Sequence, residues 1–347
     1  MSVSIGRSPA NRRRLLSRAA AWIAALVLLG IALRSVPYWE LLDTLSQLTW
    51  MQLVFLTLVN CAIVLLFSGR WWIILNALGQ SIPYLTLSAY RLSAFAVSYF
   101  TPGTQFGGEP LQIMLLRNKD GVPGSVGAAS VALDKTIELL GNFTFLAFGA
   151  VVIARFEFFS DQSGALLQLV ALGLLFLPVF FLVAAWRGHR PGTWLLHRLP
   201  AGLTTRFSIL QRTTSVVERI ENHVVAFCQG HVVALIGSMF VSLVTWVLLL
   251  MEYGLMMRFL GIELDLIQTI AVLTIARFSF LVPLPGALGA LEVGQVLALN
   301  SLGYSSAQGF SLALLIRARD LVFGAAGLLL GSVLLKERAS SSEGPER

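Results

Sequence analysis

The chain has 347 residues, of which 56% are hydrophobic and only 12% are charged. A soluble globular domain carries about 25% charged residues, so this composition excludes an ordinary soluble protein. The formal net charge of +7 would suit a nucleic-acid-binding protein. However, no basic patch stands on a soluble segment, and no nucleic-acid partner is expected.

Apolar runs long enough to cross a bilayer recur along the chain. A transmembrane helix needs roughly 20 apolar residues, and backbone in contact with lipid must satisfy its hydrogen bonds internally, as a helix does. The sequence therefore predicts an all-α integral membrane protein. Arginines ahead of the first run imitate a signal peptide, but no small-residue cleavage site follows, so an uncleaved span is expected. The predicted full spans are residues 19–36, 50–68, 122–154, 165–186, 231–257 and 306–335.

Two shorter segments, 84–117 and 266–303, are predicted to enter the membrane and return on the same side as re-entrant hairpins. With a cytoplasmic N-terminus, this scheme places most Lys and Arg residues, including Arg70, on the cytoplasmic side, as the positive-inside rule requires. Making only the first hairpin a full span would put the arginine-rich segment 187–230 outside. Two full crossings in place of each hairpin would give the same sides, so that alternative stays open. The outer side receives only Arg34, Arg155 and Arg258.

The apolar runs and the distribution of Lys and Arg divide the chain into five consecutive segments. The connection between the membrane repeats carries apolar residues at helical spacing between arginines, which predicts an amphipathic helix on the cytoplasmic membrane surface. A solvated linker helix is the alternative. Both termini are expected in the cytoplasm and the protein in the cell (inner) membrane. The segments are a basic cytoplasmic N-terminus (1–18), a first membrane repeat (19–186), the amphipathic cytoplasmic connection (187–230), a second membrane repeat (231–335) and a disordered tail (336–347).

The two membrane repeats share a motif in their hairpins. Each contains Pro-Gly followed by glycine, with a glutamate seven residues after the proline: Pro102 with Glu109, and Pro285 with Glu292. The two prolines and the two glutamates are separated by the same offset, which also aligns Asp134 with Arg317. Under the charge-derived topology the repeats have opposite orientations. This is the inverted-repeat plan of many secondary transporters, whose sites lie near the midplane where helices are broken.

The broken segments predict a binding site. Pro110 after Glu109 would start a half-helix whose positive end faces the midplane, where open glycine amides can hold an anion such as a lipid phosphate. Charges in the membrane interior are expensive and by default indicate function. The alternative is that Lys135, Arg317 and Arg319 only pair with nearby carboxylates. The candidate substrate-binding residues are Pro102, Gly103, Gly107, Gly108, Glu109, Asp134, Lys135, Glu138, Pro285, Gly286, Gly289, Glu292, Arg317, Asp320, Arg91 and Arg277.

Metal and redox chemistry find no support in the sequence. Cys61 and Cys228 lie in or beside apolar runs, and the histidines have no zinc-ligand spacing. No metal, disulfide or cofactor is expected.

The paired Pro-Gly and glutamate motifs, with Asp134-Lys135 and Glu138, resemble the transmembrane region of lysylphosphatidylglycerol synthase, over about residues 15–335. The resemblance implies a flippase-like domain, here in a stand-alone protein that works beside a separate lipid-modifying enzyme. The family often has arginine at the position of Lys135. The lysine keeps the positive charge but lacks the two-pronged guanidinium group of arginine. Because the chain ends soon after the last span, no aminoacyltransferase domain is expected.

The function expected from these observations is translocation of a phospholipid or lipid-linked amphiphile across the bilayer by alternating access, without catalysis. The substrate would be a membrane lipid with a phosphate-bearing headgroup. Two alternatives remain: an intramembrane enzyme that uses the carboxylates as general acid and base, and a non-transporting scaffold of a lipid-synthesis complex.

Overall fold

A computed structural model describes residues 39, 43, 45–100, 107–155, 161–198, 208–282 and 284–342. All regular secondary structure in these residues is helical, which agrees with the predicted all-α class. The predicted segments 1–18 and 19–36 lie outside the described residues, and so do Pro102 and Gly103 of the first motif.

In the described part of the chain, four helices are long and apolar enough to cross a membrane. Each lies over a predicted span, so the chain is a multi-pass membrane protein. They are α3 (Trp50–Ala77), α6 (Gly124–Arg155), α7 (Asp161–Trp186) and α11 (Val232–Phe259).

Helix α3 corrects one prediction. The sequence analysis ended this span at residue 68 and assigned Arg70 to the cytoplasmic surface. The helix continues to Ala77, and the Arg70 side chain is only 1% exposed. Arg70 is therefore a cation of the protein interior, where carboxylates take the place of the water that would hydrate it at the surface.

Two helical hairpins occupy the segments predicted to be re-entrant. The first joins α4 (Tyr84–Phe100) to α5 (Glu109–Lys119). The second joins α12 (Leu266–Ser279), through the short 3-10 helix η1 (Pro285–Ala287), to α13 (Ala290–Asn300). With 1.5 Å of rise per residue, these four α-helices are about 16 to 26 Å long, less than the ~30 Å hydrocarbon thickness. All four are therefore shorter than the apolar layer of a bilayer.

The last helix, α14 (Ser306–Ser342), covers the predicted span 306–335 and carries Arg317, Arg319 and Asp320 in its first half. It continues to Ser342, whereas a disordered tail was predicted from residue 336. Lys, Glu and Arg at the start of that tail are good helix formers, which explains why the helix does not stop with the apolar run.

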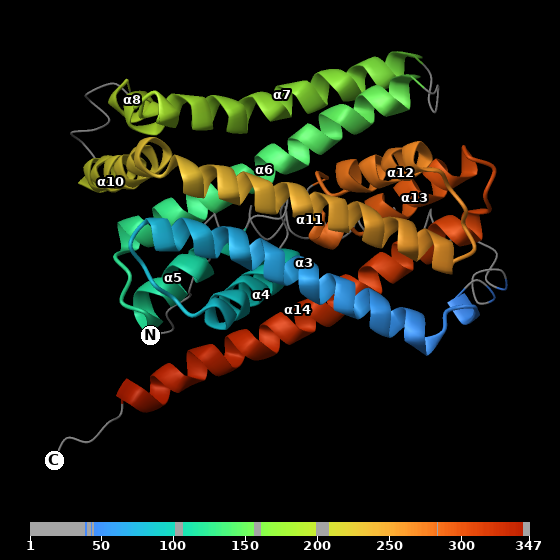
Figure 1. Cartoon of the computed structure of the whole chain (residues 1–347), viewed down its shortest axis with the longest axis horizontal. Helices are drawn as coiled ribbons and strands as arrows, with labels where there is room; N and C mark the ends of the chain where they lie inside the picture. The colour runs from blue at the N-terminus through green and yellow to red at the C-terminus, as the bar shows by residue number, and fades with distance from the viewer. Residues whose placement is uncertain are drawn as a thin grey trace, which may run out of the picture.

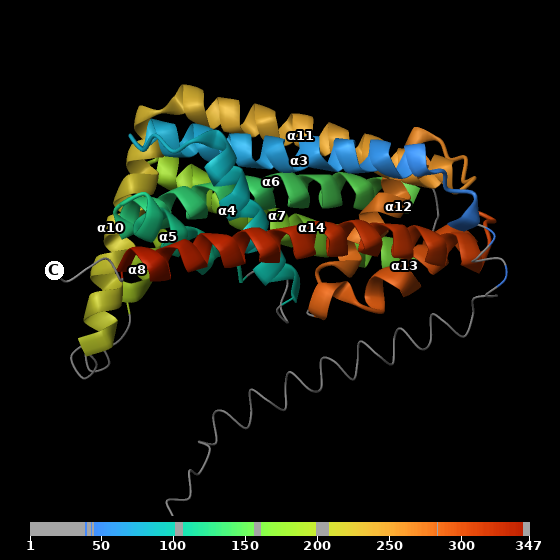
Figure 2. The same ribbon diagram turned by 90° about the horizontal axis from the view of Figure 1, so that it is seen from below.

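The connection between the halves forms α8 (Pro191–His197) and α10 (Ser208–Gly230). Helix α10 runs across one end of the bundle, roughly perpendicular to α3 and α11 (Figure 2), and packs on α6, α7 and α8. Its apolar side buries Val224 and Phe227. The sequence pattern thus correctly indicated an amphipathic helix over part of this connection.

The order of elements recurs in the two halves. Helices α3, α4 and α6 begin at residues 50, 84 and 124, and α11, α12 and α14 begin at residues 232, 266 and 306, so one constant offset relates all three pairs. Helices α3 and α11 lie side by side and run in opposite directions (Figure 1). The α4–α5 hairpin lies toward one end of the bundle and the α12–α13 hairpin toward the other.

Each half packs on the other in the same way. The long helix α14 lies against α4 of the first hairpin, and α6 lies against α12 of the second. Glycine allows the close approach at both crossings. A Cβ at Gly149 of α6 would lie 1.8 Å from Thr274 Oγ1, and one at Gly327 of α14 would lie 2.2 Å from the Leu92 carbonyl oxygen. Each hairpin therefore rests on a helix of the other half.

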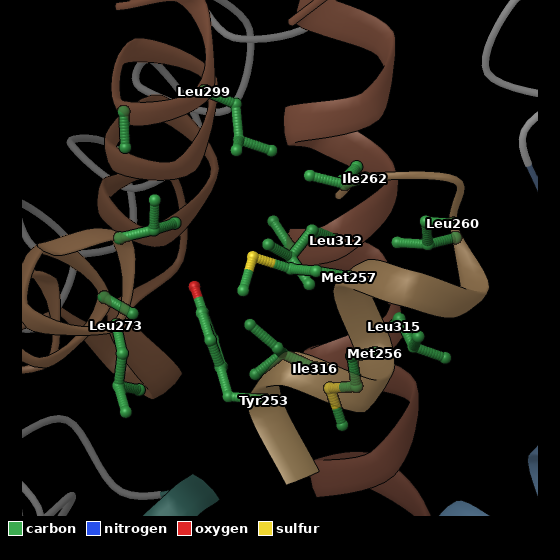
Figure 3. Close-up of a cluster of buried hydrophobic side chains, with 14 of the residues drawn as sticks. Tyr253, Met256, Met257, Leu260, Ile262, Leu273, Leu299, Leu312, Leu315 and Ile316 are labelled. Atoms are coloured by element: carbon green, nitrogen blue, oxygen red, sulfur yellow. The ribbon is translucent and has the colours of Figure 1, made fainter. Parts of the chain in front are cut away.

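The largest part of the second half's core lies between α11, α12, α13 and α14. Figure 3 shows Tyr253 of α11 extending among the side chains of Leu273, Leu312 and Ile316. The Tyr253 hydroxyl donates a hydrogen bond to Gln295 Oε1 of α13. This core fixes the second hairpin to the long helices that carry the charged residues.

Candidate functional site

Two clusters of buried charge lie within the apolar bundle. The first is built around Arg70 of α3. Its Nε donates to Asp134 Oδ1 at 2.7 Å, and its Nη2 lies 3.3 Å from Glu138 Oε2. Arg91 of α4 binds the same two carboxylates, at 2.6 Å from Asp134 Oδ2 and 2.9 Å from Glu138 Oε2. Both guanidinium groups also lie over the ring of Phe67.

Lys135 connects this first cluster to the first hairpin. Its Nζ lies 2.8 Å from Glu138 Oε1 and 3.5 Å from Glu109 Oε1. The side chains of Lys135, Glu109 and Glu138 keep 18%, 23% and 26% exposure, whereas Arg70 keeps 1%. The cluster is therefore closed around Arg70 and open on the side of Glu109.

Glu109 stands at the first position of α5, so the helix begins one residue before Pro110, where the sequence predicted its start. Its Oε2 accepts the Gly107 N–H at 2.8 Å, and the Gly108 N–H donates to Ser98 Oγ at 2.9 Å. The prediction that these glycine amides are open to an anion is therefore wrong. Carboxylate and hydroxyl oxygens of the protein already satisfy them, which is the usual solution for a buried helix start.

The second cluster contains Glu292 of α13 and Arg317 of α14. Arg317 donates to both carboxylate oxygens of Glu292, through Nε and, at 2.9 Å, through Nη2. It also donates to the carbonyl oxygens of Gly286 and Ala287 in η1, at 3.0 and 3.2 Å. Glu292 Oε2 accepts the Gly289 N–H at 2.8 Å, and the Glu292 side chain is 1% exposed. This pair holds the tip of the second hairpin to α14.

Arg319 forms the other part of the second cluster. It donates to Glu252 Oε1 of α11 at 2.8 Å, and its Nη2 lies 2.8 Å from Asp320 Oδ1. Asn60 Nδ2 of α3 donates to the same Glu252 oxygen at 2.9 Å. Arg277 of α12 lies in the electrostatic surroundings of Glu252 and Asp320, with its guanidinium stacked over the Trp246 ring at 5.0 Å.

The two clusters correspond through the same offset that relates the helices of the two halves. Lys135 corresponds to Arg317, and each of these cations binds the glutamate of its own hairpin. The sequence comparison had aligned Asp134 with Arg317; the α6 and α14 starting positions place Arg317 opposite Lys135 instead. Gly107 and Gly289, which donate to those glutamates, also correspond at this helix offset.

Reciprocal contacts join α3 and α11. Arg70 Nη1 donates to Ser242 Oγ at 3.4 Å, and Asn60 donates to Glu252. At the helix offset, Ser242 is the counterpart of Asn60, and Glu252 is the counterpart of Arg70. The two contacts are therefore equivalent. In each, a neutral polar residue of one half binds the charged residue of the other half, and the charged residue is an arginine in α3 and a glutamate in α11.

The hairpins also approach one another. Helix α4 contacts η1, and a Cβ at Gly286 would lie 3.2 Å from Tyr99 Cζ. The end of the first hairpin's entering helix therefore lies against the turn of the second, next to the carbonyl groups that Arg317 binds.

The structure brings most of the predicted site residues into the two clusters. For Pro285 only the backbone, in η1, is described. Sequence reasoning missed Arg70 as a site residue and did not include Asn60, Ser242 or Trp246. Arg70 could have been found from the repeat, because it stands opposite Glu252 at the helix offset. The other three give no signal without the fold.

Comparison with known proteins places the chain in a family. The family described as lysylphosphatidylglycerol synthase TM region matches residues 15–327. Two relatives from Methanothermobacter thermautotrophicus, both called UPF0104 membrane protein, are also similar. One is 22% identical over 266 residues, with 73% of this chain and 76% of the relative covered. The other is 24% identical over 251 residues, covering 67% and 69%. The chain belongs to the lysylphosphatidylglycerol synthase transmembrane-region family.

Proposed function

We propose that this protein is a flippase-like lipid translocator that moves a phospholipid or lipid-linked amphiphile across the bilayer by alternating access. One observation carries the proposal. Two hairpins from opposite ends of an apolar bundle each present a glutamate to a cation on a long helix, within a buried charge cluster. Broken helices that bring charge to the middle of a bundle are typical of secondary transporters.

The membrane orientation follows from the connections. The end of the bundle covered by α10 carries Arg187, Arg190, Arg198 and Arg219, and we place it in the cytoplasm by the positive-inside rule. The first hairpin would then open from the cytoplasm and the second from outside. Since all four hairpin helices are shorter than the hydrocarbon thickness, we interpret both hairpins as re-entrant and the two halves as an inverted repeat.

The two hairpins differ in how firmly they are held. The Lys135–Glu109 contact is 3.5 Å long and partly exposed, whereas Arg317 binds Glu292 at two points and the glutamate is 1% exposed. We interpret this difference as an open first half and a closed second half. Exchange of the two arrangements would give each leaflet access in turn, which is the requirement for transport.

The clusters suit a headgroup better than a chemical reaction. Each of the six carboxylates in the described part of the two clusters has a cationic partner, so none stands free as a general acid or base. A headgroup that carries both phosphate and a cationic group could exchange with such pairs without leaving net charge unpaired. We therefore propose transport rather than catalysis.

The test is transbilayer movement in proteoliposomes, measured by dithionite quenching of fluorescent phosphatidylglycerol and phosphatidylethanolamine. Glu109→Gln should reduce movement at least tenfold, because it removes the charge that pairs the hairpin with Lys135. Glu109→Asp should retain part of it. Glu218→Gln on α10, where the carboxylate is 46% exposed and 3.7 Å from Arg190, is the matched control and should behave as the wild type.

Folding is checked by size-exclusion chromatography of each variant. Movement no faster than in protein-free liposomes for the wild type with both lipids, or equal movement in Glu109→Gln and the wild type, would overturn the proposal.

A further inference from the structure

Arg277 differs from the other interior cations. Among the Lys and Arg residues of the two clusters that the structure describes, it alone has no carboxylate partner within ion-pair distance. Its Nε–H is buried without a hydrogen-bond acceptor. The nearby carboxylates of Glu252 and Asp320 are both held by Arg319 at 2.8 Å. A cation with a buried, unpaired N–H is costly, so a ligand that pairs with it would be favoured.

The surroundings of Arg277 fix its orientation. Its guanidinium lies over the Trp246 ring at 5.0 Å, and Trp246 in turn stacks on Phe145, with ring centroids 4.6 Å apart and an interplanar angle of 17°. A cation over an aromatic ring makes no hydrogen bond to an acceptor oxygen through this contact, so the guanidinium N–H groups still need acceptors. Two such N–H groups can bind two oxygens of one phosphate.

The neighbouring polar groups lack acceptors rather than donors. Tyr253, which is electrostatically coupled to Arg277, donates its hydroxyl to Gln295 Oε1, and Gln295 Nε2 is buried without an acceptor. Buried N–H groups are rarely left unpaired. Two unpaired donors, one of them charged, indicate an occupant that supplies acceptor oxygens and negative charge.

We propose that Arg277, stacked on Trp246, binds the phosphate of the lipid headgroup. This assignment rests on the proposed function, because it makes the lipid the occupant of the second cluster. It separates Arg277 from Lys135, Arg317 and Arg91, which the sequence analysis grouped with it as candidate substrate-binding residues. Those three bind carboxylates of the protein and hold the hairpins and helices together.

The experiment is a binding titration in detergent, where the bilayer has no sides. Native mass spectrometry of the delipidated protein measures binding of phosphatidylglycerol, of a diacylglycerol with the same chains, and of inorganic phosphate. We expect phosphatidylglycerol to bind more tightly than either comparison molecule. Arg277→Gln should weaken phosphatidylglycerol binding about tenfold or more, the loss of one charge-assisted contact. Diacylglycerol binding should not change.

Further variants separate binding from structure. Arg277→Lys should recover part of the affinity, because it restores the charge without the fork. Trp246→Leu should weaken binding, and Trp246→Phe, which keeps an aromatic face, should weaken it less. Arg258→Gln, at an exposed position near the end of α11, is the control and should bind as the wild type. If Arg277→Gln does not fold, the lysine and tryptophan variants decide the question.

Unchanged phosphatidylglycerol affinity in folded Arg277 and Trp246 variants would overturn the assignment. Equal affinity for inorganic phosphate and the lipid would overturn the headgroup as its source. Failure of transbilayer movement with Arg277-dependent binding intact would reject transport and leave this site in place. Transbilayer movement without Arg277-dependent binding would reject the site and leave transport in place.

Discussion

Buried charge in this protein is arranged in pairs that differ in strength. Inserting one charged side chain at the centre of a membrane costs about 2.5 to 3.5 kcal/mol on insertion scales, so each cluster needs its internal partners. Glu292 is almost completely enclosed and binds Arg317 at two points. Glu109 is 23% exposed and faces one lysine at 3.5 Å. The two equivalent glutamates therefore contribute differently to the stability of their hairpins.

This difference predicts unequal effects on stability. Glu292→Gln removes one member of a buried pair and should lower the free energy of unfolding by about 3 kcal/mol. Glu109→Gln acts on a partly exposed contact and should cost about 1 kcal/mol or less. Thermal unfolding in detergent, followed by tryptophan fluorescence, checks both, with Glu218→Gln as the exposed control. Equal melting temperatures for the two hairpin variants would contradict the assignment of closed and open pairs.

The sequence could identify Glu109 and Glu292 because each follows a Pro-Gly motif. It could not tell that the glycine amides near Glu109 are occupied, because their acceptors include Ser98 on the entering helix. Arg70 was misplaced for a related reason: a charge at the end of an apolar run looks solvated until its partners on other helices are known. The special position of Arg277 is likewise visible only in space, since it depends on Arg319 already holding the nearby acids.

At the scale of elements, helix length decides what a segment can do. Apolar periodicity and run length were enough to locate α3, α6, α7 and α11, and the Pro-Gly breaks located both hairpins. The ends of helices were less predictable: α3 and α14 both run beyond their expected limits. Side chains that pair inside the bundle, or that favour helix after an apolar run has ended, extend these helices past the hydropathy signal.

The crossings between halves give a prediction about packing. A methyl group at Gly327 would meet the Leu92 backbone carbonyl, which cannot turn aside, so Gly327→Ala should force α14 away from α4 and cost about 1 to 3 kcal/mol. Gly149→Ala would meet Thr274 Oγ1 at 1.8 Å and Thr274 Cβ at 2.8 Å, and a short β-branched side chain has little room to move, so it should cost a similar amount. Gly237→Ala in α11, where nothing lies within 4 Å, should be neutral or slightly stabilising. Melting temperatures in the same detergent measure the series, and a loss in Gly237→Ala equal to that in Gly327→Ala would contradict the close crossing.

At the scale of the whole molecule, the arrangement in a membrane can be tested at one pair of equivalent positions. Ser81 and Glu263 are exposed, lie just before the two hairpins and correspond at the helix offset. In a background with Cys61→Ala, an impermeant maleimide added outside intact cells should label Glu263→Cys and leave Ser81→Cys unlabelled until the cells are opened. Labelling of both from one side would contradict the inverted repeat.

The remaining native cysteine provides an internal check on this labelling. Cys228 of α10 is buried, and burial raises the pKa of its thiol to about 11. Thiolate is the reactive form, so Cys228 should react slowly near neutral pH and faster as the pH rises toward that pKa. Fast labelling of the native protein at neutral pH would show that α10 is not packed on the bundle at this residue. Labelling should become rapid at neutral pH after unfolding in SDS.

The duplication itself could be recognised from the motif, but its geometry could not. The offset between the two glutamates is one residue longer than the offset between the helices, because the segment from glycine to glutamate is one residue longer in the second half. The two prolines share the longer offset for a separate reason: one more residue lies between the start of the entering helix and the proline in the second half. Helices α6 and α14 return to the helix offset, so the counterpart of Arg317 is Lys135 and not Asp134. The sequence comparison aligned the Pro-Gly and glutamate motifs, whereas the starting positions of the helices determine which residues correspond elsewhere.

The exchange of supporting surfaces between α4, α6, α12 and α14 has a consequence for how such a protein could arise and assemble. Each hairpin packs on helices of its own half and also, through its entering helix, on one long helix of the other half, so a single copy expressed alone would lack part of the support for its hairpin. Two separately made fragments, cut within α8 to α10, should reconstitute the protein only when produced together. On the proposed inverted arrangement, a one-copy ancestor would have functioned as a dimer of chains inserted in opposite directions, and a later fusion would have joined the two copies in one chain.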